Sequence, residues 1–376
     1  MSHLLIIELP DGGDTDIVQA ALAHGDEFTF LCAELAPYGA QPAVIAALAG
    51  ARGFIEVPGF EPAEVERRAL AAHAQRAFDG VLCLVAHRLV AAARLARRLG
   101  LPHLNPQSAQ RLVDRSAGAA APGARLIACD VFTRQGQHRL LGVHDPLHGA
   151  PGAPASRGST FTPCGLTAGA RFAALQAYVS AELDAVGFDC GASHVQIQLS
   201  DAGPRLIRLQ PHLAGAKLAR LIGYALGRSV HADLIALHTG QALAPSSGAA
   251  PQVAVLRWIV ADREAVLDEV VLPPWQDPAI RCVEIIRQPG ERIRPPPGDV
   301  DRLGYVVVCG PSRGDAENLA DRFVARTLVR LHPTPPGLES GVPPSSAPGL
   351  PITSRPSPWS LPPIPPGPTA YSKAAP

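Results

Sequence analysis

Lysine is nearly absent from this chain: of its 33 lysines and arginines, only Lys217 and Lys373 are lysines. Lysine is a common phosphate ligand, so its scarcity leaves arginine to make most contacts with anions. Net charge is also absent, because 33 acidic residues balance the basic ones. This balance argues against a general binder of nucleic acid or of acidic membranes.

Paired cysteine motifs and long apolar runs are lacking as well. The seven cysteines form no CxxC or CxxH pair, which predicts reduced, mostly buried thiols. No segment reaches the roughly 18 apolar residues that span a bilayer. The N-terminus has no basic stretch typical of a signal peptide. We therefore expect a cytoplasmic protein that does not cross a membrane.

The first part of the chain alternates short apolar runs with longer helical patterns, as in an α/β protein with a parallel βαβ sheet. The predicted strands are 4–8, 27–32, 53–57 and 80–85. The predicted helices are 14–24, 42–49, 62–77, 88–99 and one that runs from Asn105 towards Arg115. These elements make up a predicted N-terminal domain, residues 1–116.

Two further domains, 117–250 and 251–330, mix strands and helices. In the first of them, a short linker leads to strands at 126–133 and 138–143 and then to a loop rich in glycine and proline. A helix at 167–186, a hairpin and helices at 215–226 and 230–238 complete this domain. The second has strands at 254–260, 280–287 and 303–309 and a closing helix at 315–330. The tail, 331–376, holds 15 of the 39 prolines. Such a composition buries too little apolar surface to offset chain entropy, so we expect disorder there.

The hairpin in 195–210 has the pattern of a metal and nucleotide site without its carboxylates. Alternating segments flank a predicted four-residue loop, Ser200 to Gly203. Mg²⁺ prefers hard oxygen ligands, usually carboxylates together with phosphates. The inward polar positions are instead Gln196, Gln198, Arg208 and Gln210.

Other motifs favour structural roles. The first strand-to-helix turn, 10–15, lacks a phosphate-binding glycine pattern, so Asp14 or Thr15 is predicted to cap the helix. The GxSxG of 310–314 would need a histidine downstream of Ser312, and the single one present is His332. We therefore expect Ser312 near a helix cap, with a serine hydrolase as a minor alternative.

The histidines form no recognisable metal motif. His231 and His238 lie seven residues apart on a predicted helix, which differs from an HExxH pair, and His194 and His212 stand alone on the hairpin. Ordinary hydrogen-bonded histidines are the favoured interpretation.

The order of these parts resembles the ATP-grasp superfamily, and within it the carboxylate-amine ligases of the L-amino-acid ligase type. The run from Phe78 to Ala117 is similar to the family's passage into its ATP domain, with Asp114-Arg115 at its usual Asp-Lys pair. The segment HVQIQLSDAGPRLIRLQPHLAGA is similar to the family pattern that ends in "liEinpRlaGg". The resemblance implies an ATP-grasp-like fold and, as cofactors, ATP and Mg²⁺.

Two departures from the family indicate lost chemistry. The linker between Arg115 and Arg125 is too short for the flap subdomain that closes over the nucleotide, which predicts a truncated domain. The family's metal-binding and acyl-phosphate residues correspond here to Gln196, Arg208, Gln210 and His212. Replacing an acid by Arg208 swings the local charge by two units, so we expect no ordinary Mg²⁺-ATP complex.

The leading hypothesis is a degenerate ATP-grasp protein, a pseudoenzyme without a metal site. It would act as a partner or regulatory subunit of an intact ATP-grasp ligase, form a homo-oligomer, or bind a small anion. The candidate anion ligands are Arg115, Arg205, Arg208, His212 and Lys217.

The alternative is an atypical ligase that joins a carboxylate to an amine. It would use Arg208 and Arg115 as substitutes for metal and lysine, with acids drawn from Asp130, Asp145 or Asp201.

Overall fold

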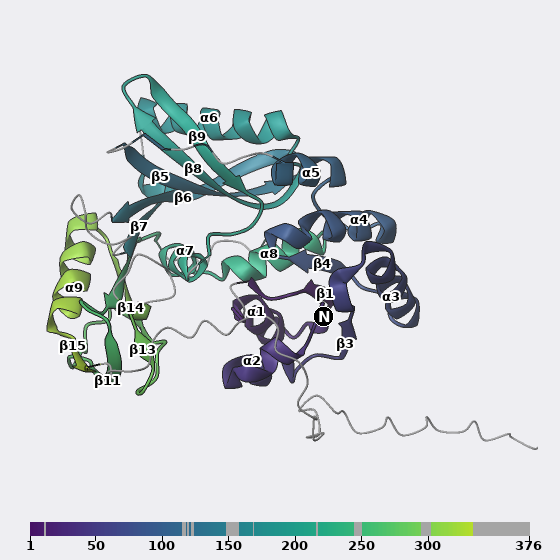
Figure 1. Cartoon of the computed structure of the whole chain (residues 1–376). Coiled ribbons are helices and arrows are strands. Elements are labelled where there is room, and N and C mark those ends of the chain that lie inside the picture. The colour runs from purple at the N-terminus through teal and green to yellow at the C-terminus, as the bar shows by residue number, and fades with distance from the viewer. Residues whose placement is uncertain are drawn as a thin grey trace, which may run out of the picture. The chain divides into compact units, whose positions relative to one another are not determined.

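The computed structural model describes residues 1–10, 13–114, 118, 120–121, 124–147, 158–167, 169–215, 217–243, 250–294 and 302–333 (Figure 1). Two compact units divide the chain, Met1–Thr334 and Pro335–Pro376. The predicted tail, beyond its first residues, lies outside the described residues. In the described part of the chain, no helix combines the length and the apolar character that a membrane span requires.

The N-terminal residues form the predicted parallel sheet, with strand order β3-β2-β1-β4. Its strands are β1 (His3–Ile7), β2 (Glu27–Cys32), β3 (Gly53–Glu56) and β4 (Gly80–Cys83). The helices are α1 (Asp16–His24), α2 (Pro42–Leu48), α3 (Pro62–Gln75), α4 (Leu89–Leu99) and α5 (Pro106–Asp114), with short 3-10 turns η2 (Ala36–Ala40), η3 (Pro58–Phe60) and η4 (Ala86–Arg88). The four strands and five α-helices begin and end within a few residues of the predicted bounds, whereas the 3-10 turns were not predicted. Glycines in the left-handed region, Gly25 and Gly100, end α1 and α4.

A large sheet of eight strands follows, in the order β12-β14-β10-β7-β6-β5-β8-β9. Its strands are β5 (Arg125–Arg134), β6 (Gln137–Leu147), β7 (Gly158–Pro163), β8 (Cys190–Ser200), β9 (Gly203–Gln210), β10 (Val253–Val260), β12 (Ile280–Ile285) and β14 (Arg302–Gly310). The turn η5 (Cys164–Leu166) leads into α6 (Ala170–Val186), and α7 (Leu218–Leu226) and α8 (Val230–His238) follow β9. The part predicted as a loop up to Pro163 thus contains a strand, β7. Because β7 pairs with β10, strands from both sides of residue 250 share one sheet.

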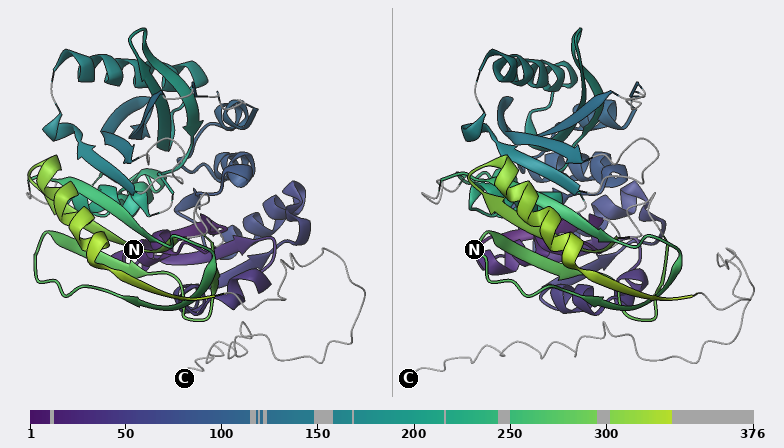
Figure 2. Two further views of the ribbon diagram at one scale, coloured as in Figure 1. Left: turned by 60° about the vertical axis from the view of Figure 1, so that its left-hand side comes forward. Right: turned by 90° about the vertical axis from the view of Figure 1, so that its left-hand side faces the viewer.

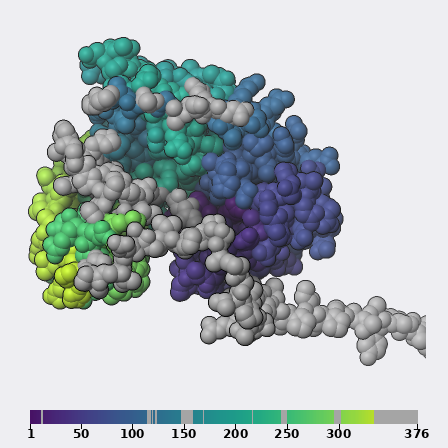
Figure 3. All heavy atoms as spheres, viewed as in Figure 1, coloured from purple at the N-terminus to yellow at the C-terminus, as the bar shows by residue number. Residues whose placement is uncertain are grey.

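The end of the described chain differs from the prediction. The closing helix, α9 (Arg313–Arg326), ends before its predicted end. The strand β15 (Leu328–His332) takes up the last three residues of the predicted helix and the first two of the tail that was predicted to be disordered. β15 pairs with an unpredicted strand, β11 (Ala265–Val271), which also pairs with β13 (Arg292–Ile293). Backbone pairing with β11 therefore outweighs the helical pattern of the sequence. Figure 3 shows α9 and β15 as yellow-green spheres at the surface.

Helix α6 covers one face of the large sheet, and this fixes where a site can lie (Figure 2). Val179 and Leu183 of α6 belong to one apolar cluster with Val195 and Ile197 of β8. Since side chains alternate along a strand, His194, Gln196 and Gln198 lie on the opposite face. The polar residues of the hairpin are thus kept out of the core beneath α6.

Candidate ligand-binding site

Strands β8 and β9 bring the predicted polar residues together on one face. Gln196 lies opposite Arg208, and His194 lies opposite Gln210. Residues that are directly opposite in an antiparallel pair have neighbouring side chains. The structure therefore juxtaposes the residues that the family resemblance singled out.

The hairpin differs from the prediction in its loop and its regularity. Ser200 pairs with Gly203, so Asp201 and Ala202 alone form the loop, which is shorter than the predicted one. Ile207 is an extra residue, because the register shifts between Gln196 and Ile197. This β-bulge puts Arg205 and Arg208 on the same face although they are three residues apart.

Gln198 connects Arg205 with Ala121, which lies between α5 and β5. Arg205 Nη2 donates to Gln198 Oε1 at 2.6 Å, and the backbone N–H of Ala121 donates to the same oxygen at 3.1 Å. The N–H of Gly118 also donates to the carbonyl of Ile207 at 2.7 Å. Gly118 and Ala121 thus lie against the hairpin, and residues 115–124 separate α5 from β5. Arg115 itself lies outside the described residues.

Arg208 lines a groove of about 470 Å³ along the edge strand β9, which we call the Arg208 groove. Its described lining is Ala86, His87, Leu112, Val113, Gly118 and the run Leu206–Pro211. This described lining contains no carboxylate, and among the described residues Arg208 makes no ion pair. The permanent positive charge of the exposed Arg208 therefore has no acid beside it among the described lining residues.

Lys217 lines a second cavity of about 490 Å³, the Lys217 cavity, at the carboxyl ends of β1 and β4. Gln210 and His212 reach it from the end of β9, while Glu8, Asp14 and Asp16 come from the N-terminal sheet. Lys217 Nζ lies 3.4 Å from Asp14 Oδ2 and 3.7 Å from Asp16 Oδ1. The charge of Lys217 is therefore balanced by two aspartates, unlike that of Arg208.

Asp14 or Thr15 was predicted to cap the first helix, and no role was predicted for Asp16. Thr15 is the N-cap residue of α1 but makes no side-chain capping bond. Asp14 Oδ1 accepts from the N–H of Asp16 at 3.0 Å, and its other oxygen faces Lys217. Burial, with the nearby charge of Asp16, raises the pKa of Asp14. Asp14 thus stabilises the turn before α1 and also lines the cavity as a titratable group.

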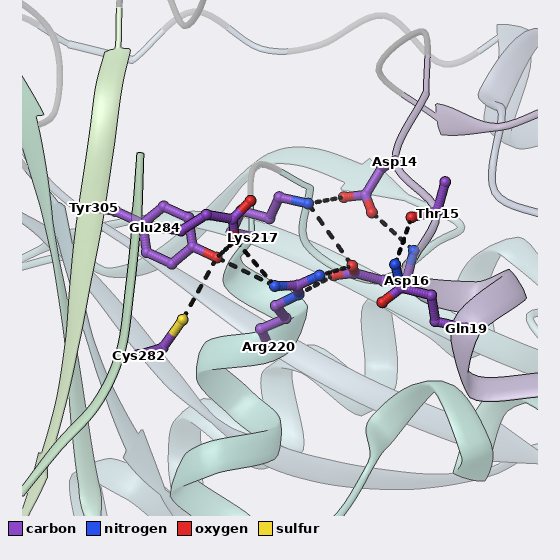
Figure 4. A network of polar contacts seen from close by, with 9 residues as sticks. All are labelled: Asp14, Thr15, Asp16, Gln19, Lys217, Arg220, Cys282, Glu284 and Tyr305. Carbon is purple, nitrogen blue, oxygen red and sulfur yellow. Dashed lines mark hydrogen bonds and ion pairs between the residues drawn. The ribbon is translucent and has the colours of Figure 1, made fainter. Parts of the chain in front are cut away.

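Arg220 joins α1, α7 and the C-terminal strands in one polar network (Figure 4). Its guanidinium donates to both oxygens of Asp16, at 2.7 and 2.5 Å, and to Glu284 at 3.1 Å. Tyr305 OH donates to Glu284 at 2.5 Å. Burial alone would raise the pKa of Asp16, but hydrogen bonds from Arg220 and the charge of Lys217 hold it below its usual range.

Strained backbone gathers around the Lys217 cavity. Glu8 and Lys217, which both line it, have left-handed φ values of 51° and 66°. Phe60 has φ 53°, and its ring lies 3.8 Å beneath the guanidinium of Arg88, which donates twice to Glu8. Non-glycine residues in this region cost about 1–3 kcal/mol each and cluster at functional sites. No sequence signal could have located these three residues, because none of the three residue types favours this conformation.

The buried acid Asp130 holds the loop that follows β9, between the Arg208 groove and the Lys217 cavity. Asp130 is fully buried and lies 2.8 Å from His144 Nε2 and 3.2 Å from His194 Nδ1. It also accepts from the N–H of Ala214 at 3.2 Å. Burial would raise the pKa of Asp130, but the two histidines hold it well below its usual range. Asp130 thus positions the loop after β9 from beneath.

Within the described residues, the acids that the atypical ligase would use do not contact Arg208. Asp130 pairs with the two histidines, and Asp145 pairs with Arg125 at 3.0 Å and with Arg313 at 2.8 Å. Asp201 is exposed in the hairpin loop. In the described part of the chain, none of the three bonds to Arg208.

The donor set on the hairpin does not suit a divalent cation. His212 Nδ1 lies 2.7 Å from the Leu213 carbonyl and donates to it, and His212 Nε2 lies 3.3 Å from the Gln210 amide. A guanidinium cannot donate a lone pair to a metal, and carboxamides are weak substitutes for carboxylates. Across the described ranges, no group of three histidines, cysteines or acids could hold a metal ion.

The remaining motifs have structural roles. Ser312 Oγ caps α9 by accepting from the N–H of Asp315, as predicted, while His332 lies on β15 near Asp268. His231 lines the Lys217 cavity, whereas His238 packs on His103 with ring centroids 4.9 Å apart. The seven cysteines are unpaired.

Comparison with known proteins supports this description. Residues 257–332 match the family model described as L-amino acid ligase C-terminal domain 2. An uncharacterized protein, y4rH of Sinorhizobium fredii, is 28% identical over 144 residues. That match covers 38% of this chain, and the chain spans about 30% of the length of this curated relative.

Three solved structures share the fold. Phosphoribosylglycinamide synthetase from Anaerococcus prevotii has a TM-score of 0.72 at 13% identity, and L-amino acid ligase from Bacillus licheniformis has 0.69 at 14%; each match covers 88% of this chain and 99% of the other. The biotin carboxylase domain of 2-oxoglutarate carboxylase from Hydrogenobacter thermophilus, crystallised with MgADP, has 0.60 at 10% identity, covering 88% and 91%. The chain therefore has an ATP-grasp fold like that of carboxylate-amine ligases.

Proposed function

We propose that this chain, whose fold is that of ATP-grasp carboxylate-amine ligases, is a degenerate member that binds a small organic anion at Arg208 without a metal. The observation behind the proposal is the pairing of Gln196 with Arg208 on the hairpin, where the resemblance expects acids. At about 4 Å and an effective dielectric near 20, two unit charges interact by roughly 4 kcal/mol. The repulsion between Arg208 and a divalent ion would be about twice as large, whereas an anion would be attracted.

Calorimetric titration of the full chain with ATP, with and without Mg²⁺, tests the proposal. We expect Mg²⁺ to add no affinity, because the hairpin offers it amides and a guanidinium. The double variant Gln196→Glu, Arg208→Glu is the matched comparison, since it returns two carboxylates to the same strand pair. Micromolar, Mg²⁺-dependent ATP binding by the unmodified chain would overturn the proposal.

The atypical ligase makes the opposite prediction. It requires a bound nucleotide to form an acyl phosphate, so failure to bind any nucleotide excludes it. We do not favour it, because Asp130 and Asp145 are engaged in other ion pairs.

A role as a subunit is the second part of the proposal. The neighbouring biotin carboxylase domain was described as a dimer, which supports testing self-association here. Light scattering of the purified chain, alone and mixed with an intact ATP-grasp ligase, separates homo-oligomer from mixed complex. A monomer under both conditions would contradict the subunit role and would leave the proposed anion site untouched, because calorimetry tests that site.

A further inference from the structure

We draw no further inference here: the strongest candidate, the Lys217 cavity at the carboxyl ends of β1 and β4, belongs to the site already described, and its described carboxylates already pair with cations of the chain, so they select no class of ligand.

Discussion

Lowering the pH from about 7 to about 5 is expected to reduce the free energy of unfolding by about 4–6 kcal/mol. Burial lowers the pKa of His103 to about 3 and those of His231 and His238 to about 4, from an ordinary value near 6.5. Below pH 6.5 these three histidines bind protons in the unfolded chain but stay neutral in the folded chain. Stability is therefore full above that pH and falls as the pH drops towards 4, by about 2 kcal/mol per histidine at pH 5.

Urea unfolding at the two pH values measures this loss. His238→Gln should be less stable near neutral pH, but its further loss on acidification should be smaller by about 2 kcal/mol, because one titrating group is gone. His332→Gln is the matched control, since its side chain is 67% exposed. Equal stability at both pH values would show that these three histidines are accessible to protons in the folded chain.

Replacing Arg220 by methionine is expected to cost about 3–5 kcal/mol of unfolding free energy, because it leaves a buried charge without its main partner. The side chain of Asp16 is only 7% exposed, and both of its oxygens accept from Arg220. Glu284 and the buried Tyr305 lose a shared contact at the same time. Lys217, at 3.7 Å from Asp16, compensates only in part.

Chemical denaturation of three variants tests this arrangement. Arg330→Gln breaks an ion pair whose partners are 61% and 53% exposed, so its cost should stay within about 1 kcal/mol. Adding Asp16→Asn to Arg220→Met should recover much of the loss, because no buried charge is then left unpaired. If Arg220→Met costs no more than the surface control, the network does not join these segments in solution.

Periodicity predicted most of the fold because most elements bury one regular face. The parallel strands and α6 follow from runs whose apolar spacing leaves little choice of period. It failed at β15, because 328–330 continue a predicted helix, 331–332 belong to the predicted tail, and pairing with β11 decides the structure of both. It also failed at β7, a strand that begins with a glycine and ends with a proline and so resembles a loop.

The hairpin face was predictable only in part, and the Lys217 cavity was not predictable. Alternation puts Gln196 beside Gln198 on β8 and Arg208 beside Gln210 on β9, but the β-bulge at Ile207 is what places Gln196 opposite Arg208. Asp16 and Arg220 meet across 204 positions of chain, with no local pattern to join them. Such contacts depend on how the helices pack, which composition and spacing do not encode.

The pairing of β7 with β10 determines where the chain can be truncated. The segment that matches a family model begins at Arg257, inside β10 itself. A chain that ends before β10 would leave β7 without this partner. The unpaired backbone N–H and C=O groups of β7 could then pair with other chains, which favours aggregation. A chain truncated between the two parts of the sheet is therefore expected to expose a strand edge that the full chain keeps paired.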